Sequence, residues 1–168
     1  MRVKDIMTTH VASCNPATNL ATAVEMLWSH DCGALPVLDD VGRVIGIVTD
    51  RDLCIALGTR DRRPSELTVG DVMQPALMKC EPGADIRSAL DTMGAEKIRR
   101  LLVVDATETL KGILCMNDVI LHSRRSGNGL SYEQVMDTLK AISTHPGAAQ
   151  VENSLAVLET QRALVASP

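Results

Sequence analysis

Short apolar runs and amphipathic stretches alternate along the first part of the chain, and each pattern predicts a different element. Residues 34–40 (ALPVLDD) and 41–49 (VGRVIGIVT) are apolar runs that meet at a glycine-containing turn, which is typical of two paired strands. Between residues 19 and 30 apolar side chains recur at every third or fourth position, which predicts a helix. A second helix is expected over residues 50–57. The apolar stripe of the first helix would contain Leu20, Ala23, Val24, Leu27 and Trp28.

The same order of patterns recurs 66 residues further along the chain, without a gap. Cys14 then falls on Cys80, Pro16 on Pro82, and the predicted first helix falls on a stripe of Ile86, Ala89, Leu90 and Met93. Identities spread over a whole length at one register indicate a duplicated unit. The matched segments are VKDIM (3–7) with VGDVM (69–73), LPVLD (35–39) with LLVVD (101–105), and GIVTDRD (46–52) with GILCMND (112–118).

Each unit reads as β-α-β-β-α, so the chain is expected to be an α+β protein built from two pseudo-symmetric repeats. One unit alone would leave a face of its sheet exposed to water, and two units packed sheet to sheet cover each other. The expected boundaries are residues 1–58 for the first repeat, 59–68 for a polar linker, 69–122 for the second repeat and 123–168 for a C-terminal tail.

The tail begins with a pattern typical of an amphipathic helix over residues 130–142. Ser131 and Gln134 have the spacing of a capping box, and the sequence HPG (145–147) would end the helix. The final twenty residues either form a second short helix from Glu152 to Leu164 or have no fixed structure. The apolar stripe of the first tail helix would consist of Val135, Met136, Leu139 and Ile142.

The composition excludes some classes of partner. The chain has one Trp, one Tyr and no Phe, so aromatic platforms for stacking nucleic-acid bases are missing, and its net charge of −4 gives no footprint for a phosphate backbone. We therefore expect no nucleic-acid partner. No apolar run is long enough to span a membrane, so no membrane partner is expected either. Five cysteines without a CxxC pair fit a reducing cytoplasm, and the four histidines lack the spacing of metal ligands.

No nucleophile–base pair, phosphate loop or pair of carboxylates at an evident site is present, so the chain is not expected to be an enzyme. One alternative stays open. Cys115 would lie at a helix N-terminus, where a depressed pKa would make its thiol reactive. A neutral replacement of the equivalent Thr49 explains the same residue more simply.

The motif VTDRD (48–52) has two interpretations. Thr49 and Asp52 have nearly the spacing of a capping box, so they can simply start a helix. The same geometry suits a nucleotide, because free N–H groups and a threonine hydroxyl meet phosphate while a carboxylate accepts hydrogen bonds from ribose hydroxyls. The second copy of the motif replaces the threonine by Cys115 but keeps Asp118. This persistence favours a role for the aspartate beyond the cap.

With these motifs in order twice, residues 1–122 resemble a tandem cystathionine β-synthase (CBS) domain protein, a stand-alone Bateman module. The resemblance implies a non-catalytic regulatory module with two clefts for adenosine-type ligands: AMP, ADP or ATP, with S-adenosylmethionine or NAD also possible. It further implies no tightly bound cofactor, a homodimer paired through helices near Ala23, Leu27, Ala89 and Met93, and an unidentified effector protein. The alternative is a structural dimerisation module whose clefts are vestigial.

The resemblance also assigns roles to residues. Asp52 and Asp118 would contact ribose, Thr49 phosphate, and Arg99 or Arg100 phosphate as well. Cys115 lacks the hydroxyl donor, so the site around Asp118 would be weaker, altered in ligand or empty. Lys79 would either compensate by meeting a phosphate or be solvated. The residues expected to line the base are Val11, Ala12, Ser13, Leu35, Pro36 and Val37, with Leu77, Met78, Lys79, Leu102 and Val103 in the second copy.

Overall fold

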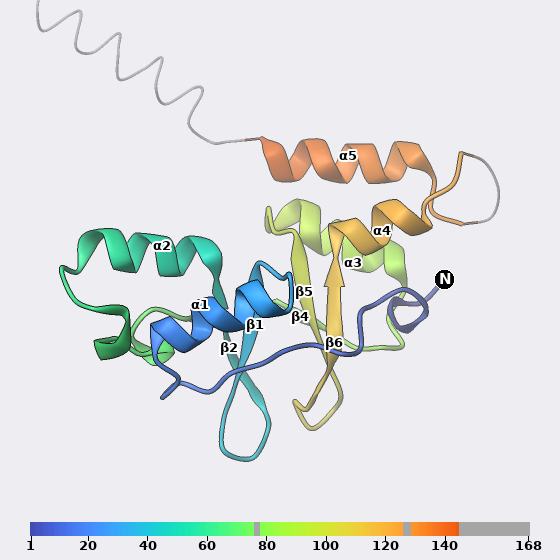
Figure 1. The fold of residues 1–168 in the computed structure, drawn as a ribbon. Helices are drawn as coiled ribbons and strands as arrows, with labels where there is room; N and C mark the ends of the chain where they lie inside the picture. Colours follow the sequence, from blue (N-terminus) through green and yellow to red (C-terminus); the bar gives the residue numbers. More distant parts are fainter. Residues whose placement is uncertain (76–77, 126–128, 145–168) are drawn as a thin grey trace, which may run out of the picture.

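The computed structural model describes residues 1–75, 78–125 and 129–144 of the chain (Figure 1). Its first half contains the short 3-10 turn η1 (Val3–Asp5), α1 (Leu20–Ser29), β1 (Ala34–Leu38), β2 (Val44–Thr49) and α2 (Asp50–Thr59). The turns η2 (Pro64–Glu66) and η3 (Val69–Asp71) lead to β3 (Gln74–Pro75) and β4 (Lys79–Cys80). The second half continues with α3 (Ile86–Ala95), β5 (Arg100–Val104), β6 (Leu110–Cys115), α4 (Met116–His122) and α5 (Tyr132–Ser143).

The strands form two small sheets of equal design, in the orders β1-β2-β3 and β4-β5-β6. The hairpin β1–β2 pairs antiparallel, and β5–β6 repeats its register 66 residues later, including the irregularity near its turn. A parallel bridge from Cys14 to Val37 extends the first sheet, just as β4 pairs parallel to β5 in the second. The predicted duplication and the α+β fold class are confirmed.

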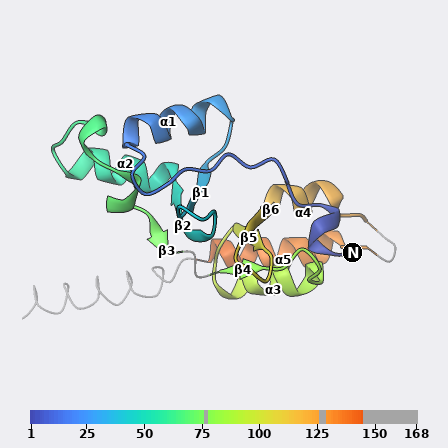
Figure 2. The same cartoon turned by 90° about the horizontal axis from the view of Figure 1, so that it is seen from below.

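The two sheets pack face to face. A buried cluster between them contains Val44 of β2 with Leu102, Val104 and Ile113 of the second sheet. The hairpins also touch at their turns, where the backbone N–H of Val44 donates to the carbonyl of Glu108 at 3.0 Å. Sheet-to-sheet packing therefore buries the face that one repeat alone would expose, and it sets the distance between the sites on the two halves. Figure 2 shows the strands between α1 on one side and α3 with α5 on the other.

The N-terminal segment of each repeat lies in the other repeat. Val3 is fully buried in the core of the second half, and Val69 is fully buried in the core of the first. The backbone N–H of Val3 donates to Ala84 at 3.0 Å, and that of Val69 donates to Thr18 at 2.8 Å, at equivalent positions of the duplication. In Figure 1 the N-terminus accordingly lies beside β6 and α4. Each sheet is completed by the exchanged segment, because Thr8 bridges to β6 as β3 pairs with β2.

The helix stripes are partly as predicted. Leu20, Ala23 and Leu27 are buried, but Val24 is 43% and Trp28 is 87% exposed. The corresponding stripe of α3 is buried at all four predicted positions. Ala23, Leu27, Ala89 and Met93 thus belong to the cores of their own halves, and the homodimer expected through these helices stays a prediction. Helical spacing identifies the buried face, but it does not say whether the chain itself or a partner covers it.

The tail helix α5 begins with the predicted capping box, in which the hydroxyl of Ser131 accepts the N–H of Gln134 at 3.2 Å. Val135 and Ile142 are buried against α3 and α4, whereas Met136 is 51% exposed. At the closest approach, a Cβ on Gly94 of α3 would lie 3.6 Å from the Cβ of Ala141. The helix is therefore part of the second half. The predicted helix from Glu152 to Leu164 lies outside the described residues.

Candidate functional site

At the first corner, β2 ends and α2 begins, and a complete capping box joins Thr49 to Asp52. The N–H of Thr49 donates to Oδ2 of Asp52 at 2.9 Å, and the Thr49 hydroxyl donates to the same oxygen at 2.6 Å. The N–H of Asp52 donates back to the hydroxyl at 3.3 Å. The helix-cap interpretation is thus correct. It occupies one carboxylate oxygen and leaves Oδ1, so the cap does not exclude a ligand.

The second corner keeps the carboxylate half of this arrangement. The N–H of Cys115 donates to Oδ2 of Asp118 at 2.8 Å, in the way that Thr49 donates to Asp52. No hydroxyl is present at position 115, so the second bond to that oxygen is missing. Both carboxylates are held in one orientation by the backbone, which prepares their free oxygens for a common partner.

The free oxygen of each carboxylate faces the exchanged segment. Oδ1 of Asp52 lies 3.5 Å from Nε2 of Gln74, and Oδ1 of Asp118 lies 3.5 Å from the hydroxyl of Thr8. These contacts are at the outer limit of hydrogen bonding and therefore weak. A diol that bonds more closely to the carboxylate can replace them at little cost.

A cleft of about 530 Å³ lies between the two repeats, next to the second corner. Thr8, His10, Val11 and Ala12 line it from one side, and Cys115, Met116 and Asn117 from the start of α4 on the other. The loop before β1 closes it with residues 30–34, and Arg99 and Arg100 contribute two cationic groups. These two guanidinium groups outnumber the one carboxylate in the lining, that of Asp31. The lining therefore favours an anionic ligand.

Arg100 reaches across the pseudo-symmetry axis. A Cβ placed on Gly33 would lie 2.9 Å from Nη2 of Arg100 and 3.2 Å from Oδ2 of Asp50. Glycine at position 33 therefore leaves room for the guanidinium of Arg100 near the carboxylate of Asp50, the first residue of α2. Gly33 and Arg99 are equivalent positions of the duplication, so the two repeats supply different groups to the centre of the molecule.

The cleft brings together five of the predicted site residues, Val11, Ala12, Arg99, Arg100 and Cys115. Strand alternation separates the others. Leu35 and Val37 point into the first core, and Val103 into the second, while Leu102 lies between the sheets. Pro36 is buried within β1, and Ser13 is half-buried just before the bridge at Cys14. A continuous apolar strand in sequence thus presents only part of its side chains to one cavity.

Lys79 and its neighbours are placed differently. The ammonium group of Lys79 forms a salt bridge with Glu108 and donates to the carbonyl of Val44 at 3.3 Å. It therefore joins the two sheets rather than facing either corner. Met78 packs against the second core, and Leu77 lies outside the described residues.

Several residues of the cleft were not anticipated from the sequence, namely Thr8, His10, Gly33, Asn117 and, at the first corner, Gln74. Thr8 and Gln74 occupy equivalent positions, each one residue after a matched VxDxM segment. The repeat register would have singled them out as a pair. The register alone does not indicate that Thr8 and Gln74 each contact the opposite repeat, because these contacts result from the exchange of segments.

The thiol of Cys115 is not activated. Burial raises its pKa, and the charge of Asp118 adds to this effect, while Arg100 opposes it. The hypothesis of a reactive thiolate at this helix start is therefore wrong. Burial also raises the pKa of Cys14 and of its equivalent Cys80 to about 11.

We predict that, in a chain that ends at Thr144, a charged aromatic disulfide reagent at pH 8 modifies Cys54 first. The Cys54 side chain is exposed, whereas a thiol with a pKa of 11 is ionised to only about one part in a thousand at this pH. The release of thiolate followed in a spectrophotometer should show one early thiol, and all five in denaturant. Cys54→Ser is the control: an early phase that survives this substitution would contradict the prediction.

Two repeats of this fold, with a helix-start carboxylate in each and a cleft between them, define a tandem CBS pair. The family model of the CBS domain matches residues 3–59 and 69–125, and the chain belongs to this family. The CBS domain-containing protein YhcV of Bacillus subtilis is 33% identical over 141 residues, which cover 84% of this chain and 94% of that protein.

Solved structures agree. The crystal structure of CBSX2 in complex with AMP is 31% identical and has a TM-score of 0.63, with 71% of this chain and 93% of that chain covered. CBSX2 is a CBS-pair protein of Arabidopsis thaliana. The conserved CBS domain protein TA0289 of Thermoplasma acidophilum, whose function is unknown, shares the fold with a TM-score of 0.71 at 24% identity, over 86% of this chain and 77% of that chain.

Within the described part of the chain, no group of three or more His, Cys, Asp or Glu side chains is arranged to hold a metal ion. A membrane span is also missing among these residues, since every helix there is too short or too polar to cross a bilayer.

Proposed function

We propose that the protein is a non-catalytic regulatory module that binds an adenine nucleotide, AMP above all, at the corners between its two CBS repeats. One observation carries the proposal. Both helix starts hold a carboxylate by its Oδ2 atom and keep its Oδ1 atom for a weak contact of 3.5 Å, at Asp52 and again at Asp118. A helix cap requires only the first of these oxygens, and the second is oriented for a ribose diol.

The charges around the second corner support a phosphorylated ligand. The guanidinium groups of Arg99 and Arg100 line the same cleft as the start of α4, so a nucleoside bound to Asp118 has cationic groups within the cavity for its phosphate. A volume of about 530 Å³ lies within the usual range of small-molecule sites. AMP bound to CBSX2, a relative that covers most of this chain, agrees with this ligand class.

Binding will regulate only if the nucleotide prefers one arrangement of the two repeats. The exchanged segments offer such a link, because a ligand that replaces Thr8 on Asp118 or Gln74 on Asp52 changes a contact between the repeats. The resulting change would be passed to an effector protein in the cytoplasm, where the five free cysteines stay reduced. A homodimer remains a prediction from the family resemblance.

A ligand panel tests the function directly. Isothermal titration of the purified chain with AMP, ADP, ATP, NAD and S-adenosylmethionine should give heat with the phosphorylated adenosines. AMP at a hundredfold excess over Kd should add about 2.7 kcal/mol to the free energy of unfolding. The melting temperature should rise accordingly. Preference for the cationic S-adenosylmethionine would contradict a cleft whose cationic groups favour anionic ligands. If none of the five ligands binds, the clefts are vestigial and the alternative of a structural module is correct.

A further inference from the structure

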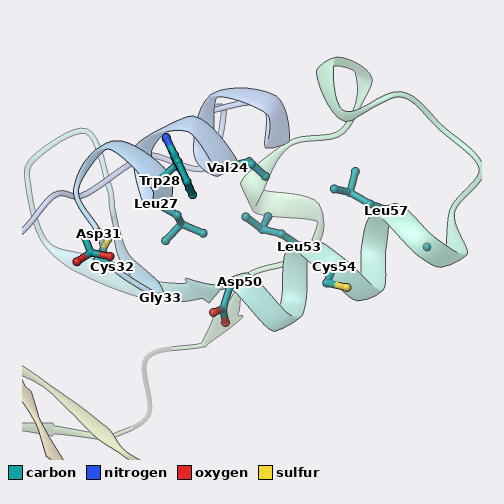
Figure 3. A pocket seen from close by; sticks show the side chains of 11 residues that line it. Val24, Leu27, Trp28, Asp31, Cys32, Gly33, Asp50, Leu53, Cys54 and Leu57 are labelled. Carbon is teal, nitrogen blue, oxygen red and sulfur yellow. The ribbon is translucent and has the colours of Figure 1, made fainter. Parts of the chain in front are cut away.

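The helices of the first repeat form an open apolar groove. It has a volume of about 900 Å³ and lies between α1 and α2 (Figure 3). Val24, Leu27 and Trp28 of α1 face Leu53 and Leu57 of α2 across it. Trp28, the only tryptophan of the chain, is 87% exposed there. An exposed indole beside further apolar side chains is unusual unless something covers them.

The equivalent groove of the second repeat is filled. It lies between α3 and α4, and α5 packs into it through Val135 and Ile142. Leu90, which corresponds to Val24 in the duplication, is only 3% exposed, whereas Val24 is 43% exposed. The same structural surface is therefore covered by an amphipathic helix in one half and uncovered in the other.

The chain contains a second copy of the α5 pattern. The sequence QVMDTLKAI (134–142) recurs 16 residues later as QVENSLAVL (150–158). The buried positions Val135 and Ile142 of α5 correspond to Val151 and Leu158, and Leu139 corresponds to Leu155. A spacing of four and then three residues places these three side chains on one face of a helix. In such a helix Val157 and Leu164 would fall on the opposite face.

Figure 1 shows α5 ending on the side of the molecule where α2 lies. The carbonyl of Thr144, just after the helix, accepts a hydrogen bond from Lys97 at 2.8 Å. Arg100, three residues after Lys97, reaches Gly33 and Asp50, which both line the groove. Six residue steps separate Thr144 from Gln150, and an extended chain covers about 20 Å in that number. The second copy therefore begins within about 20 Å of the end of α5 that lies toward the first repeat.

We propose that residues 150–165 of the same chain dock in the α1–α2 groove and cover Trp28, as α5 covers the α3–α4 groove. Each repeat would then carry one helix of the tail on its outer face. Trp28 is equivalent in the duplication to Gly94, at which α5 approaches the backbone of α3. In the first repeat the docked segment would therefore pack against an indole at this position. The sole tryptophan makes the occupation of the groove directly measurable.

The test compares the full chain with a chain that ends at Thr144, by tryptophan emission and acrylamide quenching. We expect the full chain to emit at shorter wavelength and to be quenched several-fold less, equally at low and high protein concentration. The shortened chain should lose this protection. L155D/L158D in the full chain should lose it as well, while the matched control V157D/L164D should keep it. Far-UV circular dichroism verifies that each variant remains folded.

Other outcomes overturn the proposal. Quenching of the full chain as strong as that of the shortened chain, at all concentrations, would mean that the groove is empty. Protection that grows with protein concentration would identify a second copy as the occupant. Protection that survives in the shortened chain or in L155D/L158D would exclude these residues. None of these measurements requires a nucleotide, so their results are independent of the proposed ligand.

Discussion

Val3→Asp is expected to destabilise the second repeat, and Val69→Asp the first, by about 3–5 kcal/mol each. Both valines are fully buried, and an unpaired carboxylate at such a position is among the most costly substitutions. The two residues occupy equivalent positions of the duplication, and each lies in the core of the repeat to which it does not belong in sequence. The repeat that loses stability, more than the amount lost, distinguishes the exchanged arrangement from one in which each segment packs in its own repeat.

Denaturant unfolding gives the size, and hydrogen exchange gives the location. In Val3→Asp, protection should fall first in α3, β5 and β6, and in Val69→Asp it should fall first in α1, β1 and β2. Val41→Asp is the control, because Val41 is 72% exposed and its substitution should change little. Loss of protection confined to the first repeat in Val3→Asp would contradict the exchange of segments.

Asp52→Ala and Asp118→Ala are each expected to weaken nucleotide binding at their own corner by about 10- to 100-fold. A hydrogen bond to a charged group contributes about 1.5–3 kcal/mol, which corresponds to this change in Kd. The double variant should show no measurable heat in a titration with AMP. If only one of the two single variants weakens AMP binding, a single corner is functional. We expect that corner to be the one with Asp52, where Thr49 supplies the hydroxyl.

Helix capping complicates these variants, because Asp52 and Asp118 also accept backbone N–H groups. Asp85→Ala supplies a matched control. Asp85 caps α3 by accepting the N–H of Arg87 at 2.8 Å and does not line the described cleft. It should lose about 1 kcal/mol of stability, as other N-cap substitutions do, and bind AMP unchanged. Equal loss of binding in Asp85→Ala would attribute the effect to stability rather than to the ribose contact.

The fold was predictable because the duplication shows each pattern twice. The hairpins, the helices up to Ser143 and the capping box at Ser131 follow from spacing and side-chain chemistry within a few residues, and the structure has them. The first predicted strand is reduced to the bridge at Cys14. The exchange of residues 3–8 and 69–75 was not predictable. Two repeats with the same apolar pattern accept either segment equally well, so only the three-dimensional arrangement distinguishes them.

The site was predictable at the helix starts and less so elsewhere. Thr49, Asp52 and Asp118 are recognisable because a cap has a fixed local spacing. Residues that act across the two repeats have no such spacing. A lysine near the predicted base pocket suits a phosphate, but Lys79 pairs with Glu108, whose position depends on the packing of the sheets. Helical spacing places Trp28 in a core stripe, but the side chain faces the open groove.

The exchange of segments also bears on how such a chain can arise. Two separate copies of a single repeat would trade their first residues across a true twofold axis, which is the geometry of a domain-swapped dimer. Residues 60–68, which connect α2 to η3, turn that swap into an intramolecular one. Cutting the chain there would therefore yield two fragments that each lack a core segment, and neither should fold alone. Mixed together, the fragments should restore one another, so the ancestry of the molecule can be examined by complementation.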